Sequence, residues 1–184
     1  MAPSSGHARS DRAGQFLALH GGPAPLLMAN AWDAGTAKAL AFLGFRALAT
    51  TSAGHAATLG RRDGGLTRDE AIAHAAELVA ATDLPVSADL ENGFTDDPDQ
   101  TAETVRLALD AGLAGCSIED WDPVSRRIYD IGLARDKVAA AADESAGPTR
   151  RPTGVRAGPD RSAASVGRRR VLAGQLRGTS DRGT

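Results

Sequence analysis

Residues 84–94 read LPVSADLENGF, and this stretch determines the fold that we expect for the chain. It begins like a buried strand, but it ends on Asp89 and Glu91 and then enters an Asn92-Gly93 turn. An apolar strand that finishes on carboxylates has two explanations. Either the strand runs into a loop that is acidic by chance, or it presents carboxylates to a metal ion or a reaction.

The segments around this stretch alternate short apolar runs with helical patterns. We expect strands over 25–29, 45–50, 84–90 and 113–118, and helices over 34–43, 67–82, 97–112 and 133–142. The second of these helices opens with Thr67 and Glu70, the spacing of a capping box. Because strands and helices alternate, the sequence predicts an α/β fold with a parallel sheet.

Each expected strand is followed by polar residues. The four pairs are Asn30/Asp33, Thr51/Ser52, Asp89/Glu91 and Glu119/Asp120. In parallel α/β folds the carboxyl ends of the strands lie on one face, where ligands bind. We therefore expect the four pairs to converge, which the explanation by a chance acidic loop does not account for.

Asp89 and Glu119 occupy equivalent points of consecutive strands. Two hard carboxylates from neighbouring strands suit Mg²⁺, which takes one or two protein carboxylates and keeps water or substrate oxygens. Such an ion can polarise a carbonyl and hold an enolate as it forms. The alternative is that both acids are solvated loop residues or caps of the helices that follow.

A loop of small residues is expected over 51–65, after the second strand. Its amides could cradle a carboxylate or enolate oxygen, or it could be a flexible connection only. Asp63 within it could be a turn former. His55 is a candidate ligand, whereas Cys116 lies in an apolar strand and is expected in the core.

Composition limits the classes of function. The chain has 184 residues, a formal net charge of -2 and one cysteine, which excludes an internal disulfide and suits a cytoplasmic location. There is no apolar run of the length that a membrane span needs, and the average charge gives no reason to expect a membrane or nucleic-acid partner.

That average conceals two parts of opposite charge. Residues 1–146 hold 12 Lys and Arg against 21 Asp and Glu, whereas 147–184 hold nine arginines and two aspartates. The second part contains no aromatic residue and has no helical or strand periodicity. We therefore expect an N-terminal segment over 1–24, one folded domain over 25–146 and a disordered basic tail over 147–184.

Five blocks of the sequence resemble the isocitrate lyase/phosphoenolpyruvate mutase family. They read ANAWDAGTAKAL, TTSAGHAATLGRRDGG, LPVSADLENGF, GCSIEDW and RRIYDIGLARDKVAAA, and they span about Leu26 to Ala142 in order. The resemblance implies a TIM-type (β/α) barrel, of which this chain carries the first four βα units. It also implies a Mg²⁺-dependent lyase or phosphonomutase that makes or breaks a C–C or P–C bond of a small 2-oxo or 2-hydroxy acid through an enolate, in a homo-oligomer.

The resemblance also assigns roles by matching position. Asp89 and Glu119 match the metal carboxylates, which act partly through bound water. Asp63 matches a catalytic aspartate near the reacting group, and 120–131 falls where the family has a mobile gate. The substrate-binding positions are Trp32, Thr51, Ser52 and Ala53.

The chain departs from the family in three ways. Ser87 stands where many members have an aspartate, and the Lys-x-Cys-Gly-His motif of the isocitrate and methylisocitrate lyases is absent after Glu119, which favours the mutase-like branch. After about Ala146 the resemblance stops, as a frameshift or a misannotated gene end would produce. The competing hypotheses are a truncated, inactive chain and, less favoured, a nucleic-acid-associated protein acting through the tail. The roles of Glu91 and His55 stay open.

Overall fold

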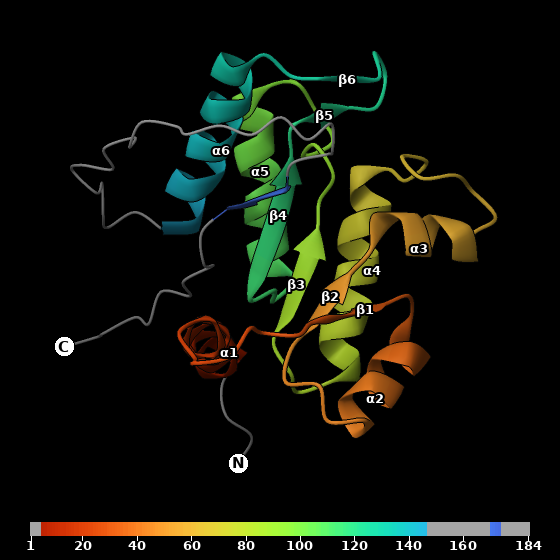
Figure 1. The fold of residues 1–184 in the computed structure, drawn as a ribbon, viewed down its shortest axis with the longest axis vertical. Helices are drawn as coiled ribbons and strands as arrows, with labels where there is room; N and C mark the ends of the chain where they lie inside the picture. The colour runs from red at the N-terminus through yellow and green to blue at the C-terminus, as the bar shows by residue number, and fades with distance from the viewer. Residues whose placement is uncertain (1–4, 147–169, 174–184) are drawn as a thin grey trace.

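The computed structural model describes the backbone of residues 5–146 and 170–173 and the side chains of residues 12–146 (Figure 1). The helices are α1 (Ser5–His20), α2 (Ala34–Phe42), α3 (Ser52–Thr58), α4 (Arg68–Ala81), α5 (Pro98–Asp110) and α6 (Ile131–Ala146). The strands are β1 (Ala29–Ala31), β2 (Leu48–Thr50), β3 (Val86–Asp89), β4 (Gly115–Glu119), β5 (Trp121–Asp122), β6 (Arg127–Ile128) and β7 (Arg170–Ala173).

Strands β1 to β4 form a parallel sheet in sequence order, and a helix follows each of them. The register pairs Ala31 with Thr50 and Asp89 with Ser117, so the carboxyl ends of the strands lie along one edge. This arrangement confirms the predicted α/β fold of four βα units. It also brings the polar residues that follow the strands to the same end of the molecule.

Strand β7 comes from the segment that the sequence predicts to be disordered. It pairs antiparallel to β4, with Glu119 opposite Arg170 and Cys116 opposite Ala173. No periodicity in the sequence indicates this strand, because main-chain pairing to an open strand edge needs none. The rest of 147–184 lies outside the described residues.

The core lies between the sheet and helices α2, α4 and α5. Leu48, Leu78, Val86 and Val105 are at most 1% exposed. Each such side chain contributes roughly 1.5–3 kcal/mol on full burial. Cys116 is also 1% exposed, as expected for a core residue, and burial raises the pKa of its thiol to about 12.

Helix α1 was not expected in the N-terminal segment. Phe16 and Leu19 pack against Ala47 and Ala114, and Figure 1 shows the helix beneath the amino ends of the strands. A Cβ atom at Gly115 would lie 2.6 Å from Cε1 of Phe16, so the helix rests directly on the sheet backbone. The helix therefore closes the end of the sheet opposite the carboxylates.

Two structural details correct or explain the helix predictions. The expected loop over 51–65 folds in part into α3, and the Thr51 hydroxyl caps this helix by accepting a hydrogen bond from Gly54 N at 3.3 Å. Asp33 caps α2, accepting from Thr36 N at 2.7 Å. For Asp33 the capping explanation is therefore sufficient.

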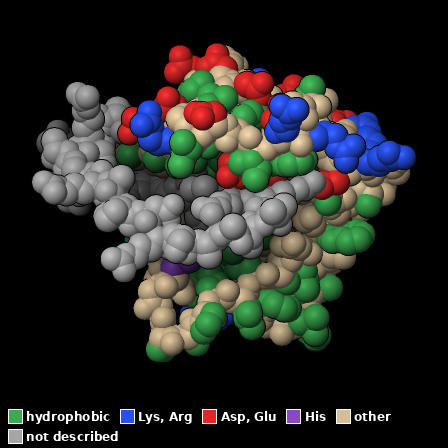
Figure 2. Space-filling model, turned by 45° about the horizontal axis from the view of Figure 1, so that its top comes forward, with side chains coloured by type: hydrophobic (Ala, Val, Ile, Leu, Met, Phe, Trp, Pro, Cys, Tyr) green, Lys and Arg blue, Asp and Glu red, His purple; other side chains and the backbone are tan. Residues whose placement is uncertain are grey.

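Beyond the carboxyl ends of the strands, β5 and β6 form a short antiparallel hairpin. Figure 2, in which the top of Figure 1 comes forward, shows acidic and basic side chains gathered around this end of the molecule. None of the described helices combines the length and the apolar character needed to cross a membrane.

Candidate active site

The centre of the site is a buried contact between β3 and the start of α3. Ser52 donates from N and from Oγ to Oδ2 of Asp89, at 3.2 and 3.0 Å. The Asp89 amide in turn donates to Thr50 Oγ1 at 2.9 Å. Asp89 is 5% exposed. Charge-assisted hydrogen bonds of this kind fix the carboxylate within the sheet edge.

Glu91 and Glu119 extend this acidic centre across the sheet. Both are 8% exposed, and the Glu119 amide donates to the Glu91 carbonyl oxygen at 2.6 Å. Glu91 has a φ of 47°, in the left-handed region that costs a residue with a Cβ roughly 1–2 kcal/mol. The turn that begins at Asn92 therefore holds Glu91 in a strained conformation next to Glu119, which gives this undecided residue a place in the site.

A cavity of about 310 Å³ opens at this acidic centre. Its volume is at the small end of the roughly 300–1,000 Å³ typical of small-molecule sites. Its lining includes Ser52, Arg62, Asp63, Glu91, Glu119 and Arg126. The structure thus brings together three residues that the sequence assigned to different parts of the site: Ser52, Asp63 and Glu119.

The other predicted site residues lie around this cavity and do not line it. Asp89 is behind Ser52, to which it is hydrogen-bonded. Trp32 packs on the start of α3, because a Cβ at Gly54 would lie 2.8 Å from Trp32 Nε1. Thr51 caps α3, and Ala53 is exposed on it. The ligand roles of these residues stay predictions.

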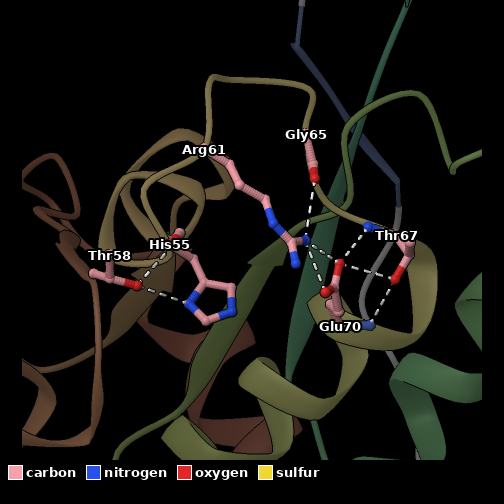
Figure 3. Close-up of polar contacts among 6 residues, drawn as sticks. All are labelled: His55, Thr58, Arg61, Gly65, Thr67 and Glu70. Atoms are coloured by element: carbon pink, nitrogen blue, oxygen red, sulfur yellow. Dashed lines mark hydrogen bonds and ion pairs between the residues drawn. The ribbon is translucent and has the colours of Figure 1, made fainter.

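An ion pair fixes the loop that carries Arg62 and Asp63. Nη1 of Arg61 lies 2.8 Å from both carboxylate oxygens of Glu70 and donates to the Gly65 carbonyl oxygen at 3.4 Å (Figure 3). Glu70 completes the predicted capping box with Thr67. The Thr67 amide, followed by Arg61, lowers the pKa of Glu70 to about 2. The loop is therefore anchored at the amino end of α4.

The two histidines of the region pair with each other. Their rings stack with centroids 3.7 Å apart, and His74 Nε2 donates to the Trp32 carbonyl oxygen at 2.9 Å. Burial, followed by the charge of His55, lowers the pKa of His74. His55 also faces Thr58, as Figure 3 shows. This arrangement links β1, α3 and α4, and the ligand role considered for His55 stays open.

Tyr129, directly after β6, anchors the hairpin. Its hydroxyl accepts from Asn92 Nδ2 at 2.8 Å and donates to Oδ1 of Asp96. The ammonium of Lys137 lies 4.2 Å from the centre of the tyrosine ring and donates to the Thr95 carbonyl oxygen. Burial, followed by the bond to Asp96, raises the pKa of Tyr129. These contacts hold the carboxyl end of the predicted gate segment in place.

The donors of the cavity fit a hard divalent cation. Glu91 and Glu119 line it with carboxylates, and the Asp89 carboxylate lies next to it, in contact with Ser52. Among the described residues no group of three or more His, Cys, Asp or Glu is arranged to enclose a metal directly. Carboxylates at neighbouring strand ends suit Mg²⁺, which usually keeps several waters and takes only one or two carboxylates.

Sequence reasoning missed several residues of the cavity. Arg62, Asn92, Trp121 and Arg126 line it together with the predicted residues. Asn92 carried a turn signal in the sequence, Trp121 lies on the short strand β5, and Arg62 and Arg126 lie on loops whose path depends on tertiary contacts. No periodicity in the sequence marks such positions.

A family model and the sequences of known proteins both match most of the folded part of the chain. The family model of phosphoenolpyruvate phosphomutase matches residues 16–152. An uncharacterised protein of Mycobacterium tuberculosis is 38% identical over 126 residues, which are 68% of this chain and 46% of that protein. The 2,3-dimethylmalate lyase of Eubacterium barkeri is 36% identical over 128 residues, 65% of this chain and 44% of that enzyme.

Solved structures show the same relationship. The crystal structure of a candidate lyase/mutase from Burkholderia cenocepacia superimposes with a TM-score of 0.74 at 48% identity, covering 77% of this chain and 51% of that one. The chain thus spans about half the length of the relatives that it matches. The residues that match the family model include strands β1 to β4, the acidic centre and the hairpin. The chain therefore belongs to the phosphoenolpyruvate mutase/isocitrate lyase family of lyases and mutases.

Proposed function

We propose that the chain is a Mg²⁺-dependent lyase or phosphonomutase that acts on a small 2-oxo or 2-hydroxy acid through an enolate. The observation that carries the proposal is the convergence of Ser52, Asp63 and Glu119 on one cavity, next to the buried Ser52–Asp89 contact. Family membership adds the class of reaction. The whole protein's substrate is part of the proposal, because the chain spans only about half of its relatives.

Each residue has a role in this proposal. Asp89 and Glu119 would hold the ion, directly or through water, and Glu91 supports it from the neighbouring strand end. When bound, Mg²⁺ supplies Lewis-acid polarisation of the substrate's oxygens. Ser52 keeps the Asp89 carboxylate oriented through its two hydrogen bonds. Asp63 accepts or returns the proton, and the hairpin limits the access of water to the enolate.

Proton exchange tests enolate formation without requiring knowledge of the natural substrate. Pyruvate is incubated in D₂O with the chain and Mg²⁺, and deuterium entry at C3 is followed by proton NMR. We expect Mg²⁺-dependent exchange that is abolished by Asp89→Ala and reduced by Asp63→Asn. Asp136→Asn serves as the control, because Asp136 is an exposed carboxylate on α6.

A second candidate is a chain that keeps the metal site but has no activity of its own. Its support is β7, which runs antiparallel along β4, where a (β/α) barrel continues with a parallel strand. The same experiment separates the two candidates. Mg²⁺ binding by calorimetry without any deuterium exchange would favour this second candidate, and exchange that Asp89→Ala abolishes would exclude it.

A further inference from the structure

Two arginines line the cavity with guanidinium groups that are not paired to any carboxylate in the described part of the chain. Arg62 comes from the loop between α3 and α4, and Arg126 from the turn of the β5–β6 hairpin. Within the described part of the chain, neither guanidinium takes part in a hydrogen bond or ion pair. By contrast, Arg61, Arg106 and Arg135 are each paired with a carboxylate.

The position of each arginine is set by its backbone. Arg62 directly follows Arg61, whose ion pair with Glu70 anchors the loop. Arg126 has a φ of 58°, and its amide donates to the Asp122 carbonyl oxygen at 2.9 Å, which closes the hairpin turn. Both guanidinium groups are therefore carried to the cavity by fixed turns, although their side chains are exposed.

We infer that Arg62 and Arg126 bind a second anionic group of the substrate, such as a distal carboxylate or phosphonate. The inference rests on the proposed function, since the first anionic group belongs at the metal side of the cavity. Guanidinium groups match carboxylate and phosphonate oxygens through paired, charge-assisted hydrogen bonds. The two arginines come from separate segments, so a bound anion would connect the hairpin to the anchored loop.

A matched pair of probes tests this assignment. Malate and 2-hydroxybutyrate share the 2-hydroxy acid group, but only malate has a distal carboxylate in place of the terminal methyl group. Binding of each is measured by calorimetry with the full chain in the presence of Mg²⁺. We expect malate to bind more tightly by about tenfold or more, as charge-assisted contacts of this kind provide.

The variants identify the residues responsible. Arg62→Gln and Arg126→Gln should each weaken malate binding by about tenfold and leave 2-hydroxybutyrate unchanged. Arg127→Gln is the matched control, because Arg127 is exposed on the same hairpin and does not line the cavity. Circular dichroism of each variant verifies that the fold is kept.

The outcomes separate this inference from the proposed function. Equal binding of the two acids, or an equal loss in the Arg127→Gln control, would refute the arginine assignment and leave the Mg²⁺ site intact. If neither acid binds and Mg²⁺ has no measurable effect, the proposed function itself fails. A loss confined to malate in the Arg62 and Arg126 variants supports the second anionic group.

Discussion

Ser52 links the second and third strands of the sheet through one side chain and one amide. Both donors reach the same oxygen of Asp89, so the serine orients the carboxylate and leaves Oδ1 to receive the Glu91 amide at 3.3 Å. The orientation of Asp89 therefore depends on a residue from another βα unit.

The Ser52→Ala variant should show this dependence. Loss of the Oγ hydrogen bond should destabilise the fold by about 1–3 kcal/mol, because Asp89 stays buried with one donor fewer. Thermal unfolding monitored by circular dichroism measures the change, and Mg²⁺ affinity should fall in parallel. Ser117→Ala, on the neighbouring strand β4, is the control. An unchanged Mg²⁺ affinity in Ser52→Ala would separate this contact from the metal site.

His74 gives the fold a dependence on pH. Its pKa lies below the ordinary 6.5 in the folded chain, because burial disfavours the charged ring. The unfolded chain therefore takes up the proton first as the pH falls, and stability is lost below about 6.5. The loss amounts to about 1.4 kcal/mol for each pH unit until the folded-state pKa is reached.

Chemical denaturation at a series of pH values tests this expectation. Between about pH 7.5 and 5.5 the unfolding free energy of the unaltered chain should fall, whereas His74→Gln should show a flatter profile. Glutamine keeps a donor for the Trp32 carbonyl oxygen but does not titrate. Parallel profiles for the two proteins would exclude His74 as the source of the pH dependence.

At the scale of the elements, the loop between α3 and α4 is held by one ion pair. Arg61 and Glu70 keep the segment that carries Asp63 close to the amino end of α4. Two tryptic sites, Arg61 and Arg62, lie in this segment, so its mobility can be measured by cleavage. The pKa of Glu70 is about 2, below its ordinary 4.5, so the contribution of its charge is complete above 4.5 and is lost only as the pH falls toward 2.

We expect Glu70→Gln to accelerate tryptic cleavage of this loop at neutral pH. The amide keeps the length of the side chain but removes the charge that Arg61 contacts at 2.8 Å. Mass spectrometry of the fragments gives the site and rate. Glu103→Gln is the control, because it removes a similar ion pair, to Arg106 at 2.6 Å, on α5. Equal acceleration by both variants would indicate a general loss of stability.

The elements also show what the sequence could and could not predict. The four parallel strands and the capping box at Thr67 depend on local patterns, and the structure confirms them. Helix α1 was not predicted because its few apolar residues are buried only by packing against the sheet, which is a tertiary contact. Helix α3 escaped because small residues and a glycine favour a loop, whereas the contact of Ser52 with Asp89 stabilises its start.

For the site, too, only part of the lining could be predicted from the sequence. Asp63, Ser52 and Glu119 were expected from the polar strand ends and the family blocks, and they do meet at one cavity. Arg62 and Arg126 could not be expected, because their approach depends on how two loops fold over the sheet. Residues on strands follow from periodicity, but residues on loops follow from tertiary contacts.

At the scale of the whole molecule, the edge of the parallel sheet at β4 is covered by a strand from the basic C-terminal part of the chain. Strand β7 covers β4 by main-chain pairing from Cys116 to Glu119. An uncovered edge strand offers free amide and carbonyl groups to another chain. We therefore expect the covering strand to limit self-association at this edge.

Deletion variants measure this protection. A chain of residues 1–146 should self-associate more than a chain of residues 1–173, which keeps β7. Size-exclusion chromatography with light scattering across a concentration series gives the mass of each. If the two chains behave alike, β7 has no protective role in solution.

The single cysteine has a practical consequence. Cys116 sits in the middle of β4 with 1% exposure, and its thiol has a pKa of about 12, so the reactive thiolate is scarce while the sheet is intact. A chromogenic disulfide reagent should therefore label the protein only when β4 opens. Since the chain has no other thiol, the rate of colour development reports the opening of this one strand. Thiol labelling of the unaltered chain therefore measures how often its parallel sheet opens at β4.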